Sequence, residues 1–198
     1  AWINLGDVRR SLGDLEGALA AFDRARAGFD ARGTSDDTYR RIALDMNVGL
    51  TRMELGDLDG ADELLRRALA NAAANGEEDT AGHQAMRHNF GALQMLRGNL
   101  AEAEAILADV RAVRTRLLGA DDLETLLTTG LLGEVRRRAG RHAAAIEAME
   151  TAYAGFARTV GRDHPYALAT ARRIAASHDA RGDEAARATW ADRAAPPA

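Results

Sequence analysis

The chain of 198 residues contains no cysteine, which excludes disulfides, thiolate nucleophiles and cysteine metal ligands. It contains no lysine either, so all 26 basic residues are arginine. The formal charge is −4, and no block of basic residues occurs. Direct nucleic-acid binding is therefore not expected, because neutralising phosphates needs clustered positive charge.

Long apolar runs are also missing, since none approaches the ~18 residues of a membrane-spanning helix. No signal-peptide pattern is present, so we expect a cytoplasmic protein with no membrane contact. Only three prolines occur, two of them in the tail, which leaves the interior nearly free of helix breakers. Apolar residues make up 46% of the chain but aromatic residues only 5%. This alanine-rich composition favours closely packed helices.

What the chain does contain is a repeat. Its turn glycines are separated by steps of 43, 42, 42 and 42 residues, and they are Gly13, Gly56, Gly98, Gly140 and Gly182. Seven residues before the turn stands a glycine or alanine, as at Gly6 and Gly133. Nine residues after the turn of the first four units stands a large apolar residue, as at Phe22 and Met149. Spacing this regular indicates a stacked helical array.

The pattern predicts one domain over 1–195, with a frayed tail over 196–198. Its five helix–turn–helix units are expected over 1–33, 34–76, 77–119, 120–161 and 162–195. The second helices of the first four units are expected over about 15–32, 58–75, 100–118 and 142–160, each ending near a second glycine, of which Gly33 is the first. The fifth unit departs from the pattern, as terminal caps of arrays do.

The turns predict their own caps. Each turn glycine ends a first helix in left-handed backbone. The next residue caps the second helix where it is Asp14, Asp57, Asn99 or Asp183. Arg141 stands at this place in the fourth unit, so that helix should begin less firmly.

The run Trp2-x-x-Leu5-Gly6, followed by Gly13, Ala18, Phe22 and Ala25, resembles the tetratricopeptide repeat. The connectors 118–126 and 160–168 resemble the Leu-Gly-x-Asp-His-Pro-x-Thr-Leu connector of kinesin-light-chain-type repeats, whose units have this length. The chain departs from the family at Arg9, where a tyrosine is usual, and it lacks the closing proline. The resemblance implies an all-α fold, a right-handed α-solenoid of about ten helices.

The resemblance further implies a concave inner face, lined by the first helices, that binds a peptide or protein segment. One position there holds Asn4, Asn47 and Asn89. In related repeats asparagine at this position contacts bound peptide, since an amide both donates and accepts hydrogen bonds. Alternatively, these amides bond neighbouring helices. Further candidates for the binding face are Leu50, Met53, Met95, Glu134, Arg137 and Arg138, although the methionines equally suit the core.

Two other patterns have competing interpretations. The triple Arg136–Arg138 could grip an acidic group or phosphate, but arginine is also favoured at helix C-termini. Glu104 is expected on a solvated helix side. The five histidines form no i,i+4 pair, and no phosphate-binding loop or nucleophile elbow occurs. We therefore expect no metal, no cofactor and no enzymatic activity.

These observations predict a non-enzymatic interaction scaffold, the sensor or docking part of a larger bacterial regulatory protein. The abundance of arginine, alanine and glycine suggests a GC-rich, actinobacterial source. Two alternatives stay open. One is a self-association module that forms a homodimer. The other is an accessory domain of an enzyme whose catalytic part precedes residue 1.

Overall fold

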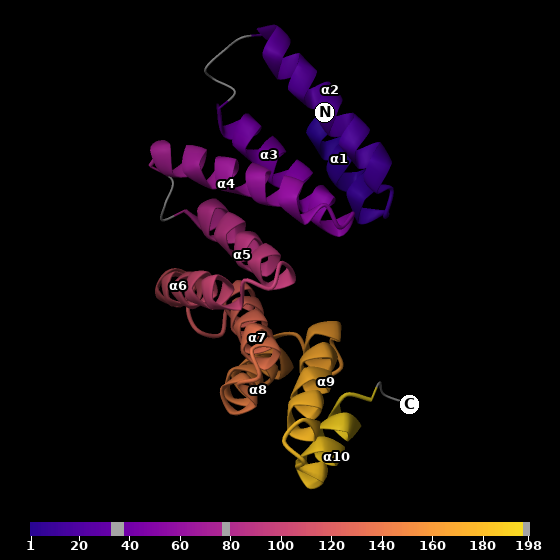
Figure 1. Cartoon of the computed structure of the whole chain (residues 1–198), viewed down its shortest axis with the longest axis vertical. Helices are drawn as coiled ribbons and strands as arrows, with labels where there is room; N and C mark the ends of the chain where they lie inside the picture. The colour runs from indigo at the N-terminus through magenta and orange to yellow at the C-terminus, as the bar shows by residue number, and fades with distance from the viewer. Residues whose placement is uncertain (33–37, 77–79, 196–198) are drawn as a thin grey trace. The chain divides into compact units, whose positions relative to one another are not determined.

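The computed structural model describes residues 1–32, 38–76 and 80–195, and over these residues it contains ten α-helices and no strand (Figure 1). The expected all-α repeat fold is thereby confirmed. The chain divides into two compact units, Ala1–Arg97 and Gly98–Ala198. Among the described residues, no helix is both long enough and apolar enough to cross a bilayer.

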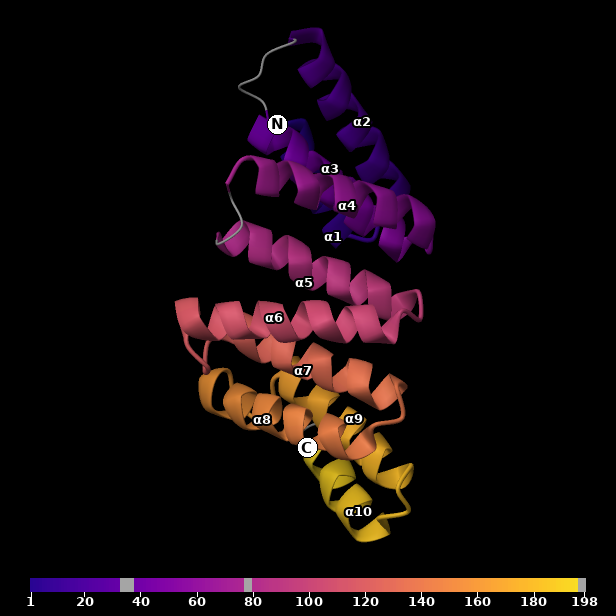
Figure 2. The ribbon, with the colours of Figure 1, turned by 60° about the vertical axis from the view of Figure 1, so that its left-hand side comes forward.

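The first unit holds five helices, which are α1 (Trp2–Ser11), α2 (Leu15–Arg32), α3 (Thr38–Glu54), α4 (Leu58–Ala74) and α5 (Ala81–Leu96). Each packs on the next, and the first helices also touch, α1 with α3 and α3 with α5 (Figure 2). Val48 and Leu44 of α3 bury themselves against Phe22 and Ala25 of α2. The first helices of neighbouring repeats therefore lie side by side within this unit.

The second unit also holds five helices, which are α6 (Leu100–Leu118), α7 (Leu123–Arg138), α8 (His142–Thr159), α9 (Pro165–Asp179) and α10 (Glu184–Arg193). Consecutive first helices touch here too, α7 with α9. Trp190 of α10 is 7% exposed and meets the ring of Tyr153 edge-on at 5.0 Å. The atypical fifth repeat thus closes this core with its tryptophan, although Trp190 lies one residue short of the expected large apolar position.

The turns follow the prediction closely. All five turn glycines have positive φ, between 72° and 84°, whereas Gly33 lies outside the described residues. The carboxylates of Asp14, Asp57 and Asp183 accept hydrogen bonds from the first turn of the following helix. Asn99 stands at the N-cap position as predicted, but its side chain makes no capping hydrogen bond. The helix after Arg141 also lacks a side-chain cap, as expected.

Close packing explains the small residues seven positions before the turns. A Cβ atom on Gly133 would lie 2.4 Å from Cγ of Met149 and 3.2 Å from the carbonyl oxygen of Ala145. A Cβ atom on Gly6 would lie 2.3 Å from the ring of Phe22. Phe22 and Met149 are fully buried. The small and large positions therefore form one repeating contact between the two helices of a repeat.

Candidate functional site

The asparagine row comprises Asn4, Asn47 and Asn89, which occupy equivalent positions on α1, α3 and α5 of the first unit. Asn4 is exposed, Asn89 is half-buried and Asn47 is 8% exposed. Within the described part of the chain, none of the three side-chain amides forms a hydrogen bond. The alternative role for these residues, bonding between neighbouring helices, therefore has no support in the geometry.

Two hollows adjoin the first helices of this unit. The larger, about 440 Å³, is lined by Trp2, Ile3 and Asn4 of α1 together with residues of α2 and α3. The other, about 310 Å³, lies between α3 and α5 and has a mainly apolar lining that includes Met46 and Met86. Both offer space beside the first helices for apolar side chains of a ligand.

The apolar site candidates of the first unit lie mostly in the core. Leu50 is 9% exposed and Met95 is 7% exposed, whereas Met53 is half-buried. Met53 thus offers more surface to a ligand than Leu50 or Met95.

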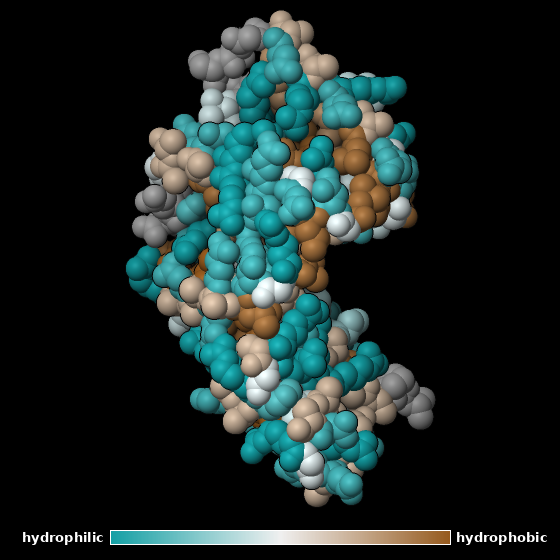
Figure 3. Space-filling model, viewed as in Figure 1, coloured by the Kyte–Doolittle hydropathy of each residue, from teal (hydrophilic) through white to brown (hydrophobic). Residues whose placement is uncertain are grey.

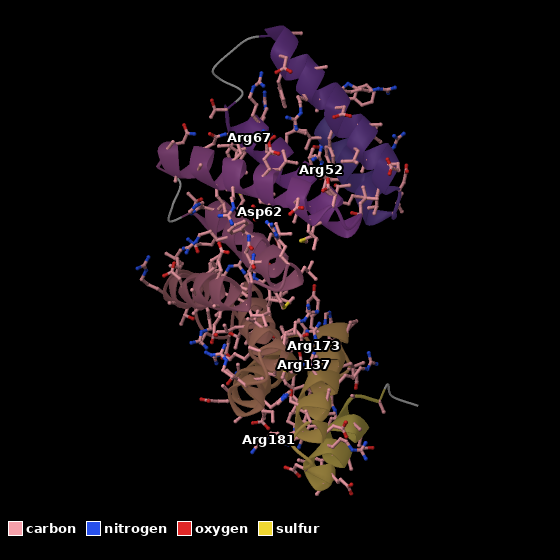
Figure 4. All side chains as sticks on the ribbon, viewed as in Figure 1. Arg52, Asp62, Arg67, Arg137, Arg173 and Arg181 are labelled. Carbon is pink, nitrogen blue, oxygen red and sulfur yellow. The ribbon has the colours of Figure 1, made fainter. Side chains whose placement is uncertain are left out.

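In the second unit, three arginines converge on one buried carboxylate. Glu134 of α7, 5% exposed, accepts two hydrogen bonds of 2.8 Å from Arg137 and one of 2.9 Å from Arg138. Arg173 of α9 lies 3.8 Å from the same carboxylate, and Figure 4 shows it beside Arg137. We call these four residues the Glu134 cluster. Its three positive charges exceed its single negative charge.

The electrostatics of this cluster keep Glu134 ionised. Burial raises the pKa of its carboxyl, but the hydrogen bonds from Arg137 and Arg138 and the charges of Arg137 and Arg173 together lower the pKa below the ordinary 4.5. Arg137 and Arg138 retain side-chain exposures of 31% and 40%. Arg137 and Arg138 of the basic triple therefore pair with Glu134, and both side chains remain partly exposed to solvent.

Sequence reasoning missed the charged contacts between consecutive repeats. Asp62 of α4 accepts a hydrogen bond of 2.6 Å from Gln94 of α5 and pairs with Arg97 at 2.7 Å. One repeat later, the equivalent Glu104 of α6 accepts a hydrogen bond of 3.0 Å from Arg136 of α7. The expectation of a solvated Glu104 is wrong, since its side chain is 19% exposed. Sequence spacing could have indicated these contacts, because 32 residues separate Asp62 from Gln94 and also Glu104 from Arg136.

These contacts also shift the pKa values of both acids. At Asp62, burial raises the pKa, but hydrogen bonds from Arg66, Arg97 and Gln94 and the charge of Arg66 together lower the pKa below 3.8. At Glu104, the hydrogen bond from Arg141 leads the causes that lower the pKa below 4.5. Both groups are therefore ionised structural partners.

No described group of three or more histidines, aspartates or glutamates is arranged to hold a metal ion.

The buried arginine of the second unit, Arg114, has a structural role. It donates to the carbonyl oxygen of Glu124 at 2.9 Å and to the hydroxyl of Thr128 at 2.8 Å, which ties α6 to α7. Its burial lowers the pKa of its guanidinium.

Models of one family account for most of the array. A model described as tetratricopeptide repeat matches residues 82–158 and 130–186, which together span more than half of the chain. The chain belongs to the tetratricopeptide repeat family. A second tetratricopeptide repeat model matches residues 1–25. Repeats of this family generally serve as protein–protein interaction scaffolds. A search of curated proteins finds no match.

Solved structures with the same fold include other tetratricopeptide repeat proteins. Repeats of a P. anserina protein assigned as a kinesin light chain align with a TM-score of 0.80 at 21% identity, over 98% of this chain and 91% of that chain. BtubC from P. vanneervenii aligns with a TM-score of 0.83 at 21% identity, over 96% and 75%. The expected likeness to kinesin-light-chain-type repeats is thus confirmed as a likeness of fold.

A Rap protein complexed with competence and sporulation factor aligns with a TM-score of 0.80 at 12% identity. The alignment covers 98% of this chain but 51% of the Rap chain. At this identity the match establishes the fold alone.

Proposed function

We propose that the first unit binds an extended peptide or protein segment along the asparagine row, as the non-enzymatic sensor or docking part of a larger bacterial regulatory protein. The proposal rests on one observation. The side-chain amides of Asn4, Asn47 and Asn89 form no hydrogen bond within the described part of the chain. The backbone of a bound segment offers donors and acceptors that can pair with these amides.

The surroundings of the row supply the other half of a peptide site. Met53 lies on the same helix as Asn47 and is half-buried, and Asn4 itself lines the hollow of about 440 Å³ together with Trp2 and Ile3. A polar row that holds a backbone, next to apolar hollows that select side chains, is a common basis of peptide recognition. A Rap protein that shares this fold is complexed with competence and sporulation factor, which supports the proposal.

In the second unit, we infer that the Glu134 cluster favours a segment with acidic side chains. Arg138 and Arg173 have side-chain exposures of 40% and 46%. One carboxylate among three guanidiniums leaves an excess of positive charge, and guanidinium groups bind carboxylates through paired hydrogen bonds.

A random peptide library displayed on phage, panned against the whole chain, supplies the probe for both sites. The peptides recovered are synthesised and measured by calorimetry. For peptides that use the asparagine row, Asn47→Ala with Asn89→Ala should weaken binding by about 5- to 150-fold, since each lost amide bond contributes roughly 0.5–1.5 kcal/mol. Asn71→Ala, an exposed asparagine on α4, is the matched control.

If every recovered peptide binds the double variant as tightly as the wild type, the asparagine-row proposal is wrong. For acidic peptides, Arg138→Ala with Arg173→Ala should weaken binding, whereas Arg158→Ala, which removes an exposed arginine paired with Asp121, should not. Equal losses in the two variants would indicate a general charge effect and contradict the cluster as a site.

A further inference from the structure

The end of α4 carries the one asparagine of the sequence that a glycine follows, Asn75 with Gly76. Asn75 is the C-cap residue of α4, and Gly76 has a positive φ of 72°. Both residues are exposed. Figure 3, drawn in the same view as Figure 1, shows the last turn of α4 at the surface of the first unit. Water therefore has access to this pair.

An asparagine followed by glycine can become an acid without an enzyme. The backbone nitrogen of the glycine loses its proton and attacks Cγ of the asparagine, so a C–N bond forms while the Cγ–Nδ2 bond breaks. The amide nitrogen takes up a proton and leaves as ammonia, and a five-membered succinimide ring remains. One water molecule then opens the ring at either carbonyl, which gives aspartate or isoaspartate. Asparagine is among the thermolabile residues, and glycine hinders the attack least, because it has no Cβ atom.

Two hydrogen bonds engage the reacting groups in the folded helix. Nδ2 of Asn75 donates to the carbonyl oxygen of Asn71 at 2.7 Å, and the backbone N–H of Gly76 donates to that of Ala73 at 2.9 Å. Both bonds belong to the last turn of α4, and the end of a helix opens at little cost in free energy. Opening of this one turn frees both groups while the rest of α4 stays folded.

The other asparagines lack this combination. Each of them is followed by a residue with a side chain. Four of them also lie inside helices, namely Asn4, Asn47, Asn71 and Asn89. Asn71 is the matched comparison, because it is exposed as well and lies one turn earlier on the same helix.

We propose that Asn75 is a site of spontaneous modification, at which deamidation through a succinimide with Gly76 turns the amide into a carboxylate and loosens the end of α4. The product places a negative charge at the C-terminus of a helix, where the helix dipole disfavours it. No basic residue stands in the last turn of α4 to offset that charge. The hydrogen bond that Nδ2 donates to Asn71 is lost as well.

The end of α4 takes part in the packing between the second and third repeats. Ala72, three residues before Asn75, is fully buried in a cluster with Ile42 of α3 and Met86 of α5. A loosened last turn therefore weakens a contact among α3, α4 and α5. The modified chain is expected to unfold at a lower temperature than the unmodified chain.

Mass spectrometry of the whole chain after incubation in neutral buffer tests the site. Trypsin releases residues 68–87 as one peptide, whose two asparagines are Asn71 and Asn75. Fragmentation of this peptide locates the mass increase of an amide that has become an acid. We expect Asn75 to convert at least about tenfold faster than Asn71, because the terminal turn opens more easily and glycine leaves the attack unhindered. A sample digested without incubation gives the starting level.

Two variants separate the reaction from its consequence. Asn75→Gln keeps the amide but would need a larger ring, so it should show no conversion in the same incubation. Asn75→Asp stands for the product and should unfold at a temperature about 1–4 °C lower than Asn75→Gln. Incubated wild-type protein should approach the unfolding temperature of Asn75→Asp as residue 75 converts.

Two results would overturn the modification site. One is no conversion of Asn75 in the whole chain under conditions in which a synthetic peptide of residues 68–87 converts, since the fold would then protect the asparagine. The other is equal conversion of Asn71 and Asn75 in the whole chain. Equal unfolding temperatures of Asn75→Asp and Asn75→Gln would overturn the loosening of α4.

Discussion

Arg67 of α4 donates two hydrogen bonds, each 2.8 Å long, to the two carboxylate oxygens of Asp45 on α3. Arg26 of α2 reaches the same carboxylate with one longer contact of 3.3 Å. Asp45 is 7% exposed. One buried carboxylate therefore links three consecutive helices of the first unit.

The two arginines should differ in what they contribute. Arg67→Lys loses the paired geometry that only a guanidinium provides, so we expect the free energy of unfolding to fall by about 1 kcal/mol. Arg26→Lys should change it by less than about 0.5 kcal/mol, because Arg26 makes a single, longer contact. Urea unfolding measures both variants. Equal effects would show that the paired hydrogen bonds of Arg67 stabilise the fold no more than the single contact of Arg26.

Glu134→Gln should reveal the stability linked to the low pKa of Glu134. The folded pKa lies below the ordinary 4.5, so the ionised carboxylate stabilises the fold fully above that value. This contribution is lost as the pH falls through the folded pKa. We expect the variant to be less stable by about 1–2 kcal/mol near pH 7 and to approach the wild type in acid. Urea unfolding across this pH range checks the prediction, and a pH-independent difference contradicts it.

Asp7 occupies the position on α1 that Glu134 occupies on α7, yet its pKa shifts in the opposite direction. Burial raises it above 3.8, and the nearby charge of Arg10 offsets this only in part. One carboxylate oxygen of Asp7 is buried without a partner. A raised pKa favours the fold at low pH, and this stability is lost as the pH rises through the folded pKa.

Asp7→Asn should therefore raise the free energy of unfolding near pH 7 by roughly 0.5 kcal/mol, a modest value because the site is partly solvated. Below about pH 3.8, where the native carboxyl is protonated, the gain should vanish. Thermal unfolding of both proteins at the two pH values measures this. A destabilised variant at neutral pH would show that the Asp7 charge is favourable.

Gly133→Ala should lower the free energy of unfolding by about 1–3 kcal/mol, because the added methyl group would overlap Met149 and press on the backbone of Ala145. Gly28→Ala is its matched control on α2, where a Cβ atom meets nothing within 4 Å. There the better helix propensity of alanine should stabilise the chain by up to about 1 kcal/mol. If thermal unfolding shows the same change in stability for both variants, close packing against Met149 is not the reason for a glycine at position 133.

The contact between Gly133 and Met149 could be predicted from the sequence, because the two helices of each repeat pack with a small residue on one helix against a large residue on the other. The left-handed turn at Gly140 was predictable for the same reason. The hydrogen bonds of capping side chains were less predictable. Asn99 occupies the N-cap position, but its side chain makes no capping hydrogen bond. Arg141 pairs with Glu104.

The Glu134 cluster shows why candidate sites are harder to predict. Arg137 and Arg138 read as an unpaired basic run, but helical geometry turns both back onto Glu134, three and four residues earlier. Arg173, the third partner, comes from the next repeat, and only the packing of α7 against α9 brings it near. Sequence periodicity predicts the contacts that repeats share, whereas this cluster occurs in only one repeat of the described part of the chain.

The pairs Asp62–Arg97 and Glu104–Arg136 each join one repeat to the next. In a repeat protein, such contacts determine whether neighbouring repeats unfold together or separately. Part of the cooperativity of this chain is therefore electrostatic. Added salt should screen the more exposed members of these pairs, so the unfolding transition should broaden as well as shift.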